Sequence, residues 1–546
     1  MDPLAAGAKR RRSFCGPVEP LLITLGGPKM VITSGSPPPT RVRGCTDRTV
    51  AGRYAVDDRI DMYLPVGGGF RSVVQLGDIE VAARPLAALR PLIGDERFAW
   101  LEAAATRTHT LLDGTVVWNV SSTASGGGVA EMLHVLVGYI CGTGIDARWV
   151  VIEGDLPFFV ITKRIHNRLH GIAGEEGALG RVEAQHYQEV TAANAAILCG
   201  RVRPGDVVLL HDPQTAGMAP LLRDAGARVI WRSHIGTDTV NAWTEEAWGL
   251  LRPHLALCDA FVFSRRAYVP TWVPTARVSI IPPSIDPFSP KNQAIPDEDV
   301  PAFLARIGLT SGPTDRPAKF RRGDGTPGEV VRPATIVSED GAPEVLRNLV
   351  VQVSRWDRLK DMYGVMTGFA SRVVGRVDAQ LALVGPSPEG VMDDPEGASV
   401  LAECVAGWAG LPVAARRRIR IVTLPMTDVE ENAAMVNALQ RSATAIVQKS
   451  LAEGFGLTVA EGMWKGKPVV ASRVGGIIDQ VVPDTGILLD DATDLDAFGD
   501  AVVALLKQPG EVIRLGANAR RHVLEGFVGD RHLIQYAALI ERLFTM

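Results

Sequence analysis

The sequence predicts an α/β fold in which two Rossmann-like domains face each other across a cleft. The chain has 546 residues, more than one compact domain of ordinary size holds. Short apolar segments alternate with helical patterns in two separate series, as expected for two doubly wound sheets. A stretch rich in Pro, Gly and charged residues separates the series at 291–345. We expect the connection between the domains and an inserted loop there.

The overall composition excludes several classes of partner. Apolar residues make up 46% and charged residues 22% of the chain, and the formal net charge is −4. The apolar fraction is enough to fill two cores. The negative net charge provides no positive field to hold nucleic acid or an anionic membrane. The most apolar long window, 132–145, is interrupted by His134 and by glycines, and it is shorter than the roughly 20 residues of a membrane span. We therefore expect a cytoplasmic protein that acts on small molecules, with homodimerisation left open.

The first series predicts an N-terminal domain over 46–290. Residues 1–45 precede it and lack a hydrophobic period, so we expect a disordered tail. A short apolar run and a helical pattern occupy 73–112. Strands are expected at 115–120, 148–152, 207–211, 229–233, 260–264 and 278–281, and a helix is expected at 129–140.

The second series predicts a C-terminal domain over 346–510. Residues 511–546 are expected to form helices, and their packing back on the first domain is left open. Arg321 and Arg322 lie in the inserted loop, which we interpret as a solvated linker outside the cleft. The strands are expected at 349–354, 380–384, 419–424, 445–448, 469–472 and 487–489.

The segment 453–461 has the most specific chemistry. It directly follows an expected strand and opens a helix. Gly454 and Gly456 let the backbone approach a ligand, and free N–H groups at the helix start favour an anion such as a diphosphate. Glu453 precedes the helix and Glu461 lies inside it, so the two carboxylates can reach opposite ends of an extended ligand.

A basic loop follows the first strand of the second series. Ligands of open α/β sheets bind at the carboxyl ends of the strands, where this loop lies. Arg355 offers a fork of donors and Lys360 a point charge, so together they would neutralise a diphosphate leaving group. The Asp-x-Asp patterns at 494–496 and 297–299 do not follow a strand that would direct them at a nucleotide. We expect neither a metal ion nor another cofactor.

The first domain offers candidates on the opposite wall of the cleft. Gly126-Gly127-Gly128 lies at a strand-to-helix junction. His211 with Asp212, and His234, each stand at the end of an expected strand and should point into the cleft. A strand-end histidine is equally compatible with a capped structural residue.

Together these segments resemble retaining GT-B glycosyltransferases, in which Glu-x7-Glu and an Arg…Lys pair bind a nucleotide sugar. They are most similar to the trehalose glycosyltransferring synthases and their relatives, the retaining trehalose phosphorylases. The resemblance extends from about residue 73 to the C-terminus and implies the GT-B fold. The matching text is 126–131, 147–154, Thr162-Lys163 with His166-Asn167, His211-Asp212-Pro213-Gln214 and 453–467.

The resemblance implies a role for each matching residue. Arg355 and Lys360 would hold the donor diphosphate, and Glu461 would bind the ribose hydroxyls. The attack would occur on the front face of the sugar, with retention of configuration. The implied catalytic residues are Arg355, Lys360, Glu453 and His234; the donor contacts are Gly127, Gly454, Phe455, Gly456, Leu457, Thr458 and Glu461; the acceptor contacts are Gly126, Gly128, Asp212 and Gln214.

Three functions remain open at this point. The first is a transferase, acting reversibly or not, that makes trehalose from a nucleoside-diphosphate glucose and glucose. The second is a retaining trehalose phosphorylase, or a related transferase with another acceptor. The third is a sugar-binding protein without catalysis. Glu461 favours the transferase because phosphate alone offers no ribose, and the cations Arg355 and Lys360 argue against a protein that only binds.

Overall fold

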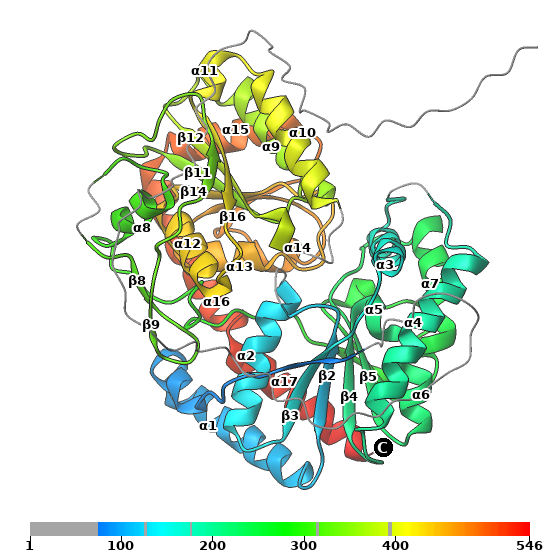
Figure 1. Cartoon of the computed structure of the whole chain (residues 1–546). Helices are drawn as coiled ribbons and strands as arrows, with labels where there is room; N and C mark the ends of the chain where they lie inside the picture. Colours follow the sequence, from blue (N-terminus) through cyan, green and yellow to red (C-terminus); the bar gives the residue numbers. More distant parts are fainter. Residues whose placement is uncertain (1–74, 125–127, 175–176, 313–315, 391–395, 546) are drawn as a thin grey trace, which may run out of the picture.

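The computed structural model describes residues 75–124, 128–174, 177–312, 316–390 and 396–545. Within these residues it contains two seven-stranded sheets and one two-stranded sheet. Figure 1 shows the first large sheet in the lower half of the molecule and the second in the upper half. No helix in the described ranges combines the length and apolarity that crossing a bilayer requires.

The first sheet has the strand order β1-β3-β2-β4-β5-β6-β7. Its edge strand β1 pairs antiparallel with β3, and the other strands run parallel. Strands β2 and β4 are buried along their whole length, as expected where helices cover both faces. The strands are Gly77–Ile79 (β1), Val117–Ser121 (β2), Ala147–Val151 (β3), Val207–His211 (β4), Arg228–Ser233 (β5), Ala260–Phe263 (β6) and Val278–Ile280 (β7).

Seven helices in the described residues belong to the first domain. The prediction that the glycine run opens a helix is confirmed, because α2 begins at Gly128. In order they are Arg90–Leu111 (α1), Gly128–Gly142 (α2), Leu156–Leu169 (α3), Arg181–Cys199 (α4), Asp212–Ala216 (α5), Ala219–Asp224 (α6) and Ala242–Leu255 (α7).

The second sheet has the order β10-β13-β12-β11-β14-β15-β16, with only its edge strand β10 antiparallel. The strands are Thr335–Val337 (β10), Leu349–Val353 (β11), Gln380–Pro386 (β12), Ile419–Leu424 (β13), Ala445–Gln448 (β14), Val469–Ser472 (β15) and Gly486–Leu489 (β16). The helices after β11 are Met362–Arg372 (α9), Gly397–Ala409 (α10), Val413–Arg416 (α11), Val429–Ser442 (α12), Leu457–Trp464 (α13), Ile477–Gln480 (α14) and Leu495–Leu506 (α15).

The segment 291–345 differs from the solvated linker that its composition suggested. It contains α8 (Val300–Ile307), the hairpin β8 (Lys319–Arg321) and β9 (Pro327–Glu329), and the strand β10. Phe320 and Val330 are buried in the core of the second domain. Arg322 forms ion pairs with Asp428 and Glu430. Three-residue strands are too short to show a hydrophobic period, so composition alone suggested a loop.

Two long helices end the described chain. They are α16 (Pro509–Gly526) and α17 (Gly529–Thr545). Helix α17 runs back to the first domain, drawn in red in Figure 1. Its residues Tyr536, Leu539, Ile540 and Leu543 join strand residues of the first sheet in one apolar core. The C-terminal helix therefore ties the two domains together.

Candidate active site

A cavity of about 770 Å³ lies between the two domains, at the carboxyl ends of both parallel sheets. Every predicted site residue that the structure describes lines it. Gly126 and Gly127 lie outside the described residues. The predicted residues that line the cavity are Gly128, Asp212, Gln214, His234, Arg355, Lys360, Glu453, Gly454, Phe455, Gly456, Leu457, Thr458 and Glu461.

The loop after β14 leads to the start of helix α13. Gly456 has φ 84°, a left-handed conformation that suits glycine, and α13 begins at the next residue, Leu457. A Cβ on Gly454 would lie 2.5 Å from the backbone oxygen of His234, in the opposite domain. Glycine at 454 therefore permits close contact between the domains, and Leu457 and Thr458, the first two residues of α13, line the cavity.

The basic loop after β11 is fixed by a buried carboxylate. Asp357 is 1% exposed, and its Oδ2 lies 2.9 Å from Nζ of Lys163, which comes from α3 in the first domain. Burial acts to raise the pKa of Asp357, but Lys163, Arg355 and Lys360 hold that pKa well below its usual value. Asp357 thus stays ionised and gathers cations from both domains. Sequence reasoning missed Asp357 and assigned Lys163 no role.

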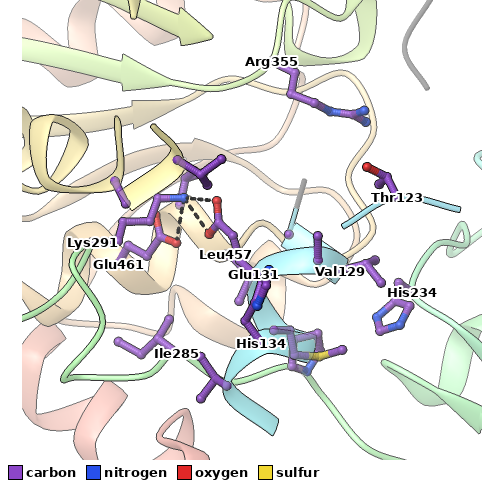
Figure 2. Close-up of a pocket in the computed structure, with 18 of the residues that line it drawn as sticks. Thr123, Val129, Glu131, His134, His234, Ile285, Lys291, Arg355, Leu457 and Glu461 are labelled. Atoms are coloured by element: carbon purple, nitrogen blue, oxygen red, sulfur yellow. Dashed lines mark hydrogen bonds and ion pairs between the residues drawn. The ribbon is translucent and has the colours of Figure 1, made fainter. Parts of the chain in front are cut away.

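Lys360 and Glu453 contact each other directly. Nζ of Lys360 lies 2.6 Å from Oε2 of Glu453, and both side chains are largely buried. Arg355 lies on the same loop with its side chain 28% exposed, and in Figure 2 it extends along the upper side of the cavity. The structure therefore brings together the cations and the carboxylate that sequence reasoning proposed from separate loops.

Helix α3 presents a polar face to the same part of the cavity. Lys163, His166 and His170 recur at helical spacing and all line the cavity. Nδ1 of His170 is buried without a hydrogen-bond partner among the described residues. Burial, followed by the charge of Lys360, lowers the pKa of His170 to about 4. These histidines were not among the predicted site residues, although their helical spacing from Lys163 was visible in the sequence.

A chain of hydrogen bonds begins at the fully buried Arg232 and fixes the tautomer of two cavity histidines. Arg232 Nε donates to Nδ1 of His234 over 3.3 Å. Nε2 of His234 must then carry the hydrogen, which it donates to Nδ1 of His211 over 3.0 Å. Nε2 of His211 in turn donates to Oδ1 of Asn119 over 3.3 Å. Both ring nitrogens of His234 are therefore engaged within the protein.

The same arginine connects the cavity wall to the C-terminal helix. An N–H of Arg232 donates to Nε2 of His532 over 3.2 Å, and another hydrogen bond joins Arg232 to the hydroxyl of Tyr536. Nδ1 of His532 then donates to Oγ of Ser284, 2.9 Å away. Helix α17 thus contributes to positioning His234.

Asp212 stands at the first position of α5 with φ 62°, an unusual value for a residue other than glycine. Its Oδ1 accepts from the backbone N–H of His234 over 2.7 Å. Burial raises the pKa of Asp212 to about 7, although this hydrogen bond and Arg232 act in the opposite direction. Gln214, two residues further, also lines the cavity. Strained backbone at a strand end is typical of functional sites.

At the other end of the cavity a lysine lies between two carboxylates. Nζ of Lys291 is 2.8 Å from both oxygens of Glu131 and 3.3 Å from Oε1 of Glu461 (Figure 2). Glu131 comes from α2, Lys291 from the connection between the domains, and Glu461 from α13. Sequence reasoning missed Lys291 because it lies in the stretch interpreted as a linker.

Comparison with known proteins identifies the family. Residues 119–270 match the protein family described as "Trehalose synthase, N-terminal domain", and residues 429–522 match the family described as "Glycosyl transferases group 1". Trehalose synthase of Rubrobacter xylanophilus is 34% identical over 468 residues, which cover 84% of this chain and 97% of that protein. The chain belongs to the trehalose synthase family. It is therefore a glycosyltransferase, as the sequence predicted.

More distant relatives extend the comparison. Trehalose phosphorylase of Pleurotus sajor-caju is 26% identical over 449 residues, which cover 77% of this chain and 57% of that protein. A solved α,α-trehalose-phosphate synthase (UDP-forming) from Burkholderia xenovorans has a TM-score of 0.56 at 14% identity, covering 79% of this chain and 100% of that chain. The predicted GT-B fold is confirmed.

Among the described residues no group of three or more His, Cys, Asp or Glu side chains is arranged to hold a metal ion. The first Asp-x-Asp pattern has a structural role, because Asp494 caps α15 through the N–H of Ala497. Asp299 pairs with Arg316 within the connection. Two of the positive charges that line the cavity, Arg355 and Lys360, come from the loop after β11.

Proposed function

We propose that this glycosyltransferase forms trehalose from a nucleoside-diphosphate glucose and free glucose, with retention at the anomeric carbon. The arrangement around the start of α13 supports this proposal. Arg355 and Lys360 lie beside the loop that leads into the helix, and Glu461 lies inside the helix at the other end of the cavity. Cations, free backbone N–H groups and a carboxylate follow one another in the order that diphosphate and ribose would require.

The reaction we propose needs no nucleophile from the protein. The bond from C1 of glucose to the β-phosphate oxygen breaks, and a hydroxyl oxygen of the acceptor forms a new bond to C1 on the same face. Negative charge builds up on the diphosphate as the C1–O bond breaks, and the acceptor proton passes to the departing phosphate oxygen. Lys360 and Arg355 would stabilise that charge, which is the main electrostatic task of the site.

Glu453 and Lys360 would exchange partners when the donor binds. In the structure they satisfy each other at 2.6 Å. A sugar hydroxyl would donate a hydrogen bond to Glu453, and the diphosphate would form an ion pair with Lys360. Gly454, Phe455 and Gly456 would present backbone N–H groups beside the sugar, while Asp212 and Gln214 on the opposite wall would hold the acceptor glucose.

A second candidate is a retaining trehalose phosphorylase, in which inorganic phosphate replaces the nucleotide. The relatives from Pleurotus, whose name is trehalose phosphorylase, favour this alternative. Against it, Glu461 is 2% exposed and lines the cavity away from Arg355 (Figure 2), beyond where a phosphate held by Arg355 and Lys360 would lie. A phosphate ion does not reach that far, and a nucleoside does.

One experiment separates the two candidates. The protein is incubated with trehalose and either UDP, ADP, GDP or inorganic phosphate, and loss of the disaccharide is followed by NMR. We expect consumption with at least one nucleoside diphosphate and formation of an α-linked nucleotide sugar. Consumption with phosphate alone would replace our proposal by the phosphorylase. Formation of a β-linked product would disprove retention.

A further inference from the structure

Lys291 uses all of its hydrogen-bonding capacity inside the cluster Glu131–Lys291–Glu461. An ammonium group has three N–H donors. Two of them account for the contacts of 2.8 Å to the oxygens of Glu131, and the third points to Oε1 of Glu461 at 3.3 Å (Figure 2). No donor remains for a ligand. Any effect of Lys291 on a ligand must therefore act through one of its two carboxylate partners.

Glu461 has one oxygen held and one oxygen free for a ligand. Its side chain is 3% exposed, and Oε2 is buried with no hydrogen-bond partner among the described residues. A buried carboxylate oxygen without a donor is costly. Glu461 lines the cavity, so a donor from a bound molecule is the missing partner. The backbone of Glu461 is also fixed, because its carbonyl accepts from Lys465 over 3.2 Å.

The charge of the cluster depends on Lys291. Burial acts to lower the pKa of Lys291, but Glu131 and Glu461 raise that pKa above the usual lysine value, so the amine remains an ammonium ion. The ammonium separates two carboxylates that would otherwise repel each other. Without it, the two carboxylates would turn apart, and Glu461 would lose the orientation in which it accepts a hydrogen bond from a ligand.

We infer that Lys291 is a positioning residue that orients Glu461 and supplies its counter-charge, and thereby makes the enzyme select nucleotides with an intact ribose diol. The inference rests on the proposed function, because it takes the ligand of Glu461 to be the ribose of the donor. The 2′- and 3′-hydroxyls donate to the carboxylate that Lys291 fixes. Lys291 itself comes from the connection between the domains, so this segment contributes to donor selection.

The test compares ribose with deoxyribose in binding to the full chain. Calorimetry first identifies which of UDP, ADP and GDP binds, and then measures the 2′-deoxy and 3′-deoxy forms of that nucleotide. We expect the wild type to bind the ribonucleotide about tenfold more tightly than the deoxy forms, since each lost bond involves a charged acceptor. Lys291→Met should bind the ribonucleotide about tenfold more weakly and no longer distinguish it from the deoxy forms.

Three controls make the result specific. Lys319→Met removes an exposed lysine of the same connection and should leave both affinities unchanged. The KM for glucose should be unaltered in Lys291→Met, because the acceptor lies beside Asp212 on the other wall. Lys291→Arg keeps the charge and should restore most of the discrimination. If Lys291→Met does not fold, Lys291→Gln replaces it, since glutamine keeps a donor but removes the charge.

The outcomes separate failure of this inference from failure of the proposed function. If the wild type binds none of the three nucleotides, the nucleotide-sugar proposal and the role of Lys291 both fall. If the wild type binds a nucleotide but accepts its deoxy forms equally well, only the assignment of Glu461 and Lys291 to ribose is overturned. The same holds if the neutral variants at 291 discriminate as strongly as the wild type.

Discussion

Nζ of Lys360 and Oε2 of Glu453, 93 positions apart in the chain, form an ion pair of 2.6 Å inside the cavity. Lys360 ends the loop after β11 and Glu453 lies in the loop after β14, and these two strands are neighbours in the second sheet. The pair is a direct consequence of parallel strand order, which places successive carboxyl ends side by side. Each side chain therefore holds the other in place.

The first prediction concerns Lys360→Ala. We expect kcat to fall about 100-fold or more, with a much smaller change in the affinity for the unreacted donor, because charge on the diphosphate grows as the glycosidic bond breaks. Steady-state kinetics together with calorimetry of the nucleoside diphosphate separate the two effects. Lys319→Ala is the matched control. A change confined to KM would make Lys360 a residue of uniform binding instead.

The second prediction concerns metal ions. In the proposed function Arg355 and Lys360 would supply the positive charge that a divalent cation supplies in other transferases, so we expect turnover to survive an excess of EDTA. The assay follows trehalose formation before and after chelation and after addition of Mg²⁺ or Mn²⁺. Loss of activity with EDTA and recovery with either cation would show that the two side chains do not suffice.

The third prediction concerns stability in acid. Burial, together with the charge of Arg232, lowers the pKa of His211 to about 3 and lowers those of His234 and His532 well below 6.5. In the unfolded chain each of these histidines binds a proton as the pH falls through about 6.5, whereas in the folded protein it stays neutral. Their contribution to stability is therefore present above pH 6.5 and is lost as the pH falls towards 4.

The size of this effect is measurable on one residue. At pH 5 each such histidine costs about 2 kcal/mol of stability relative to neutral pH. His532→Gln removes the proton site but keeps an acceptor for Arg232 and a donor for Ser284. Its Tm should therefore fall less between pH 7.5 and pH 5 than that of the wild type. The exposed His109 provides the control, and equal pH dependence in His532→Gln and the wild type would contradict the prediction.

Much of the fold follows from the sequence because its strands are buried on both faces. Such strands are mostly apolar, so β4 and β13 begin and end at the residues that the sequence pattern predicts, 207–211 and 419–424. The hairpin of β8 and β9 escaped detection for the opposite reason. Its strands have three residues each, and only Phe320 and Gly328 at their centres are buried.

The residues of the candidate site also fall into a group that the sequence predicts and a group that it does not. Residues that follow strands, such as Arg355 and Glu453, are predictable because the fold places every strand end at the cavity. Lys291 and Lys163 are not, since one lies in an irregular segment and the other in the middle of a helix, and their partners come from distant parts of the chain. No spacing rule in one sequence links Lys291 to Glu461, 170 positions away. Only the packing of the domains brings them together.

The last prediction tests that packing directly through Gly454→Ala. The new Cβ would lie 2.5 Å from the backbone oxygen of His234 and 3.3 Å from Cα of Ile235. Backbone atoms cannot turn aside as a side chain can, so the two domains must separate slightly to accept the methyl group. Each domain keeps its own core, and we therefore expect only a small change in Tm.

The catalytic effect of Gly454→Ala should be much larger than its effect on stability. The groups that would bind the donor, on the second domain, and those that would bind the acceptor, on the first, would move apart by part of the overlap between the new Cβ and the backbone of His234. A displacement of about 1 Å at reacting centres can cost about 100-fold in rate. We expect kcat/KM to fall by about that factor. Gly510→Ala, where a Cβ meets nothing within 4 Å, should leave kcat/KM unchanged. Activity of Gly454→Ala within twofold of the wild type would mean that the reaction takes place in a more open arrangement of the domains, with His234 and Gly454 already apart.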